Sequence, residues 1–183
     1  MSIDEVLRSA VDRGELTFLP MRMPSDPQHR VMLLQKDVLE LVTGPYGNAL
    51  HERRGNALWA DMEAFVSGQA ISVCLTPRRA GNADFGLLEP RGDATWDYRS
   101  RNPSPGLRLI GCFAKADTFV AMDWWPRSVP VSWSNKEPLQ DNELRWRIAI
   151  HECLVLWNRI LPGLVPLVGG GVERYVSENA ILV

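Results

Sequence analysis

Five basic side chains gather around one predicted hairpin and could together hold a phosphate group. Within residues 96–127, two apolar runs are bracketed by turn residues, and arginines alternate with hydrophobic residues on the way in. An aromatic ring beside guanidinium groups suits a nucleic-acid backbone with a stacked base. The basic residues are Arg99, Arg101, Arg108, Lys115 and Arg127, and the aromatic residues are Trp96 and Tyr98.

These residues could cleave RNA without a metal ion. Such a reaction needs cations that hold the scissile phosphate and a base that takes the proton of the 2′-hydroxyl. Arg99, Arg108 and Lys115 are the candidates for holding the phosphate, and Tyr98 or Asp97 could orient the attacking hydroxyl. The alternative is a solvated sheet face of ordinary charge density. The local partners would then be Asp97, Asp117 and Asp123.

Three tryptophans after the hairpin indicate a second kind of site, a protein interface. Trp124 and Trp125 are adjacent, so a strand would send them to opposite faces. Trp133 follows in a proline-bounded stretch, and an exposed tryptophan beside Arg127 has the composition of an interface hot spot. We therefore predict a binding surface that also includes Arg101; the alternative is that these indoles cover an edge of the core.

Several well-known catalytic patterns are absent from the sequence. His151-Glu152 resembles the start of a zinc-protease motif, but Val155 stands where its second histidine would be. There is no Gly-x-Ser-x-Gly, and Gly169–Gly171 lacks the Lys-Ser/Thr of a phosphate-binding loop. We expect no metal and no cofactor.

Composition predicts a single soluble domain. The 183 residues are 45% hydrophobic and 23% charged, with a net charge of -2, which excludes a strongly basic nucleic-acid protein. Cys74, Cys112 and Cys153 lie in apolar stretches and are expected to be buried reduced thiols. No signal peptide or membrane span is predicted, so we expect a cytoplasmic location.

The order of elements favours an α+β fold over residues 1–183. Helices are predicted in residues 1–68, where Ser2 and Glu5 form a capping box and residues 31–42 and 46–66 have helical spacing. Residues 71–125 should form a central antiparallel β-meander of about four or five strands, with residues 77–91 as a surface loop. A long C-terminal helix and a tail fill residues 141–183.

The predicted helix from residue 141 to 161 has two apolar faces. A broad arc includes Ala149, Cys153 and Trp157, and a narrower stripe consists of Leu144, Ile148 and Val155. A helix with two apolar faces packs against two surfaces. We expect the sheet on one side, and an N-terminal helix or another subunit on the other.

Residues 50–127 resemble the RelE-like toxins. The resemblance is carried by a strand with Asp97, Tyr98 and Arg99, a turn, Leu107-Arg108-Leu109, and an apolar strand over residues 118–122. It implies a metal-independent mRNA endonuclease fold that is neutralised by an antitoxin. The lysine-rich stretch that follows the last strand in that family is replaced here by Trp125-Pro-Arg127.

Our leading hypothesis is an interaction or regulatory protein, with a relative of the RelE-like toxins as one form of it. It would bind a protein partner or a second copy, and RNA is a further candidate partner. The first alternative is a metal-independent ribonuclease that acts through the basic hairpin. The second is a small-ligand-binding domain with a pocket lined by Trp146 and Trp157.

Overall fold

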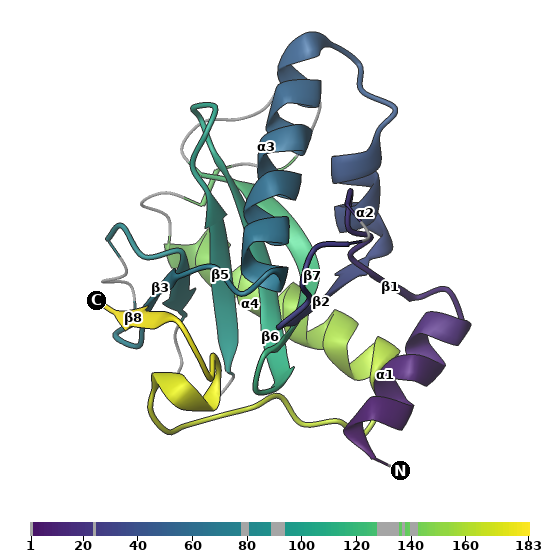
Figure 1. Ribbon diagram of the computed structural model, residues 1–183, viewed down its shortest axis with the longest axis vertical. Coiled ribbons are helices and arrows are strands. Elements are labelled where there is room, and N and C mark those ends of the chain that lie inside the picture. Colours follow the sequence, from purple (N-terminus) through teal and green to yellow (C-terminus); the bar gives the residue numbers. More distant parts are fainter. Residues whose placement is uncertain are drawn as a thin grey trace.

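A computed structural model describes residues 2–23, 25–77, 81–88, 94–127, 136, 138–139 and 143–183. In these ranges, helices flank one mixed sheet (Figure 1). The helices are α1 (Ile3–Asp12), α2 (Lys36–Thr43), α3 (Ala49–Val66), α4 (Glu143–Ile160) and the 3-10 helix η2 (Val172–Arg174). The strands are β1 (Leu16–Phe18), β2 (Val31–Gln35), β3 (Ile71–Cys74), β4 (Phe85–Leu87), β5 (Thr95–Ser100), β6 (Leu107–Lys115), β7 (Thr118–Pro126) and β8 (Ala180–Leu182).

The predicted meander forms the centre of a larger sheet. Strands β4, β5, β6 and β7 pair antiparallel in succession, as expected. The full order is β1-β2-β7-β6-β5-β4-β3-β8, and β2–β7, β3–β4 and β3–β8 are parallel pairs. The described sheet is therefore larger than the predicted antiparallel sheet of about four or five strands, because it has eight strands and includes parallel pairs.

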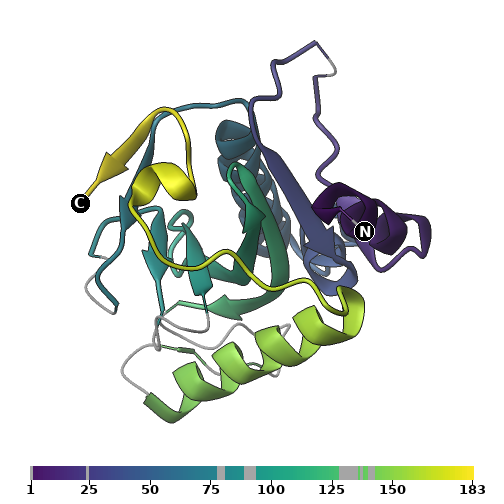
Figure 2. The same ribbon diagram turned by 90° about the horizontal axis from the view of Figure 1, so that it is seen from below.

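Helices cover both faces of this sheet (Figure 2). On one face, α2 and α3 pack on a cluster of aromatic residues in which the Phe85 ring lies 4.7 to 5.3 Å from those of Tyr98, Phe65 and Phe113. On the other face, α1 and α4 cover Ile110, Cys112 and Met122 among others. The predicted packing of the C-terminal helix on the sheet is confirmed.

Two predicted elements were wrong because tertiary pairing overrides local pattern. Residues 31–35 form β2, since Leu33 and Leu34 are buried on opposite faces of the sheet beside β7, and only residues 36–43 are helical. Continuous apolar runs are typical of parallel strands that are buried on both faces. The predicted loop at residues 77–91 contains β4, whose Phe85 is fully buried.

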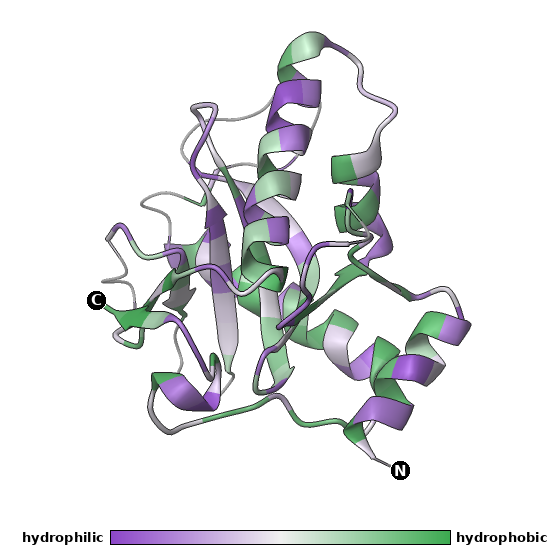
Figure 3. Cartoon of the chain, viewed as in Figure 1, coloured by the Kyte–Doolittle hydropathy of each residue, from purple (hydrophilic) through white to green (hydrophobic). Residues whose placement is uncertain are grey.

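In the hydropathy colouring (Figure 3), β8 is green, whereas β5 is pale to purple because Asp97 and Arg99 lie on it. Close packing between β6 and β7 requires Gly111, because a Cβ atom there would lie 2.1 Å from the carbonyl oxygen of Val120.

All three cysteines are free and buried, as predicted. No helix in the described ranges is long and apolar enough to cross a membrane.

A buried arginine joins the C-terminal segment to the rest of the fold. Arg30 is 3% exposed and donates to the carbonyl oxygens of Gln69 at 2.9 Å and Glu178 at 2.5 Å. Burial lowers its pKa, and Asp117, 3.8 Å away, opposes the shift. Asp117 in turn accepts a hydrogen bond of 2.9 Å from the backbone N–H of Ser177. This network holds the chain that leads into β8.

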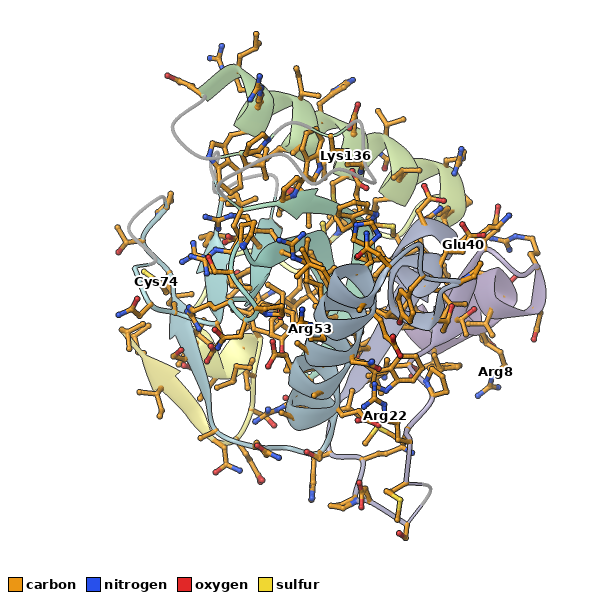
Figure 4. All side chains as sticks on the ribbon, turned by 90° about the horizontal axis from the view of Figure 1, so that it is seen from above. Arg8, Arg22, Glu40, Arg53, Cys74 and Lys136 are labelled. Carbon is orange, nitrogen blue, oxygen red and sulfur yellow. The ribbon has the colours of Figure 1, made fainter. Side chains whose placement is uncertain are left out.

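Replacing Arg30 with methionine should therefore destabilise the protein and loosen β8. The change leaves buried carbonyl groups without donors, which we expect to cost about 2–4 kcal/mol of unfolding free energy in urea. Hydrogen exchange at the Val183 amide, which donates to Val73, should accelerate. Arg8→Met is the control, because Arg8 is exposed on α1 (Figure 4). Equal stability of the two variants would contradict this role.

Candidate functional site

The predicted basic hairpin is organised around a buried carboxylate. Asp97, on β5, is fully buried and accepts two hydrogen bonds from Arg99, at 2.7 and 3.2 Å. Arg108, opposite Arg99 on β6, donates to the same carboxylate. Residues 97 and 99 lie on one face of β5 because side chains alternate along a strand. Two of the arginines predicted to hold a phosphate are thus engaged by the protein itself.

Helix α4 covers this ion cluster. The Arg108 guanidinium lies over the ring of Trp146, 4.9 Å from its centroid, and its Nε has no hydrogen-bond partner. Burial lowers the pKa of Arg108 to about 10, and the nearby Arg99 and Arg127 also lower it, while Asp97 opposes the shift. The cluster is therefore strongly desolvated and rich in positive charge.

Arg101 and Arg127 lie at the rim of the cluster. Arg101 pairs with Asp84 at 2.9 Å and donates to the carbonyl oxygen of Ala83 at 2.6 Å, so it fastens the chain before β4. The stem of Arg127 runs along Gly106, where an added Cβ atom would lie 3.0 Å from Arg127 Cδ. Burial lowers the pKa of Arg127, and Arg99 and Arg101 lower it further.

A cavity of about 240 Å³ opens beside Arg101 and contains two carboxylates that sequence reasoning missed, Asp61 and Asp84. Burial raises the pKa of Asp61, although Ser100 opposes the shift. Burial alone would raise the pKa of Asp84 as well, but hydrogen bonds from Ser72 and Arg101 lower it. Within the described ranges, no three His, Cys, Asp or Glu side chains are grouped as metal ligands.

The four candidate catalytic residues do not converge. The Tyr98 ring is buried under α3 on the sheet face opposite Asp97, and its hydroxyl donates to the carbonyl oxygen of Asp61 at 2.5 Å. Lys115 lies at the far end of β6 and pairs with Asp4 of α1 at 2.5 Å. Only Arg99 and Arg108 meet, and both are bound to Asp97. Arg99 and Arg108 therefore lie together, whereas Lys115 lies apart from them.

The predicted tryptophan surface is also different in the structure. Trp124 and Trp125 point to opposite faces, as expected, but they are only 8% and 7% exposed because both faces are covered. Lys136 lies over both indoles, beneath α4 in Figure 4. Trp133 lies outside the described residues. Burial of Trp124 and Trp125 favours the alternative that these indoles cover the core, and little of either ring is exposed to a partner.

The structure leaves a different apolar surface exposed. Leu144, Ile148 and Val155 of α4, the outer stripe, are 64%, 40% and 52% exposed. The opposite face of α4 is buried against the sheet through Ala149, Cys153 and Trp157. Trp146 and Trp157, expected to line a ligand pocket, line none of three cavities formed by described residues: one of about 480 Å³ between Leu87 and Tyr175, and two of about 240 Å³ beside Arg30 and Arg101.

Comparisons with protein-family profiles, curated proteins and solved structures find no match to this chain. The resemblance to RelE-like toxins therefore stays a prediction.

Replacing Tyr98 with phenylalanine tests whether its hydroxyl is structural. Losing one buried hydrogen bond while the ring stays packed should cost about 1 kcal/mol in urea unfolding. Tyr98→Ala, which also empties the aromatic cluster, should cost about 3–5 kcal/mol. Equal stability of Tyr98→Phe and wild type would contradict the assigned hydrogen bond.

Proposed function

We propose that this chain is a protein-interaction module that places the outer stripe of α4 in an apolar groove of a partner protein. The observation that carries the proposal is the exposure of Leu144, Ile148 and Val155 on a helix whose other face already packs on the sheet. Apolar residues at such helical spacing are how an amphipathic helix anchors itself in a groove. Position 151, one turn beyond Ile148, is histidine, so the groove must also accept an imidazole.

Charge around the outer stripe restricts the partner further. Arg147 and Arg159 are exposed on α4 beside the stripe, and Glu152 carries one opposing charge. A groove with an acidic rim would complement the two arginines and would speed association at low salt. We therefore take the partner to be a protein with an apolar groove and acidic residues at its edge.

The first step of the test captures the partner in the native cells. A photo-cross-linking side chain at position 144 should give one discrete adduct with another protein, because this position is at the end of the stripe. The same side chain in place of Val165, which is 74% exposed but lies outside the stripe, is the matched control and should not give that adduct. An adduct between two copies of this chain, or no adduct, would overturn the proposal.

The second step measures affinity with the purified partner. Val155→Glu should weaken binding by about tenfold or more, since it introduces a charge into an apolar contact. Its unfolding free energy should stay within about 0.5 kcal/mol of wild type, because the site is solvent-exposed. Val165→Glu makes the same chemical change away from α4 and should bind like wild type. Full affinity of Val155→Glu would contradict the proposal.

A further inference from the structure

Among the described residues, the charges around Asp97 do not balance. Arg99 and Arg108 both bind this carboxylate, and Arg127 follows two residues after Trp125, which is the partner of Arg108 in the strand register. Arg127 also lowers the pKa of Arg108, and Arg99 lowers that of Arg127. Arg101 is near Arg127 as well, but Asp84 and Asp61 compensate its charge. Counted over the described residues, three guanidinium groups against one carboxylate leave a surplus of two positive charges in a partly desolvated position.

Arg127 carries the unmatched charge. Within the described part of the chain, its guanidinium has no hydrogen bond or ion pair, whereas Arg99 and Arg108 both bind Asp97. Its stem is fixed along Gly106, and its backbone N–H donates to the Gly106 carbonyl oxygen at 3.0 Å. The group is therefore positioned by the hairpin while its donors stay unused. The Nε atoms of Arg101 and Arg108 are likewise buried without a partner.

From this geometry we infer an oxyanion-binding site at the end of the sheet, formed by Arg127 with Arg108 and Arg99, that takes a phosphate dianion. Desolvated cations are costly unless an opposite charge accompanies them. A dianion matches the surplus of two charges, whereas a carboxylate would neutralise only one. Guanidinium N–H groups bind phosphate oxygens strongly. Among the described residues, Arg127 and the Nε of Arg108 have unused donors, whereas Arg99 contributes its positive charge. The phosphate site does not involve the outer stripe of α4 and needs no partner protein.

Inorganic phosphate is the probe, measured by calorimetry with the full chain in a phosphate-free buffer of low ionic strength. Wild type should bind it saturably and with a stoichiometry of one. Arg127→Gln should weaken binding by about tenfold or more, as expected for the loss of a charge-assisted contact. Arg53→Gln is the matched control, because Arg53 is exposed on α3 (Figure 4), and it should bind within about twofold of wild type.

Thermal unfolding shows that a loss of binding is not a loss of fold. Without phosphate, Arg127→Gln should melt at or above the wild-type temperature, because it removes a charge that its neighbours repel. Added phosphate should raise the melting temperature of wild type and of Arg53→Gln, but not that of Arg127→Gln. Absence of saturable binding, or equal weakening in both variants, would overturn the inference. Arg127-dependent binding of a single-stranded RNA without binding of phosphate would also overturn it, in favour of a phosphodiester ligand.

Discussion

The neutralisation of Asp97 by Arg99 and Arg108 is the interaction on which this end of the molecule depends. The middle residues of strands β5, β6 and β7 are buried on both faces, so a charge placed there is largely removed from bulk water. The carboxylate is fully buried and is bound by two arginines, one of which stacks on Trp146 of α4. Sheet, helix and hairpin therefore meet at one ion cluster, and its geometry decides which arginines remain available for binding.

The burial of this ion cluster divides the arginines into those whose donors are used inside the fold and those whose donors could bind a ligand. Arg99 and Arg101 hold the chain before β4 through the carbonyl oxygens of Gly81 and Ala83, so their donors are largely used inside the fold. Arg127 follows the last strand and is fixed by its stem alone. Among the described residues, the arginines that look in the sequence like one basic surface are thus mostly paired within the fold, and Arg127 at the rim has no ion pair.

Because helices cover both faces of the sheet, some elements could be predicted from the sequence and others could not. The capping box of α1, the β6–β7 hairpin and the two apolar faces of α4 follow from local spacing, and the structure contains them. Strands β2, β4 and β8 are three to five residues long, and their pairing with distant strands determines their conformation. Local patterns carry no information on such pairing.

The site was harder to predict for a related reason. The alternation of side chains along a strand correctly predicted that Trp124 and Trp125 point to opposite faces of the sheet. It could not show that helices cover both faces. The spacing of Asp97 and Arg99 did contain a usable signal, since residues two apart on a strand share a face and can pair. By contrast, nothing local indicates that Asp61 of α3 would lie in a cavity with Asp84.

A double-mutant cycle between Asp97 and Arg108 tests the central claim most directly. Asp97→Asn, Arg108→Gln and the double variant would be compared with wild type by urea unfolding. If the two groups form the buried pair described, the coupling energy should exceed about 1.5 kcal/mol, and the double variant should be more stable than Asp97→Asn alone. A coupling energy within about 0.5 kcal/mol of zero would show that the two residues act independently and would contradict the account.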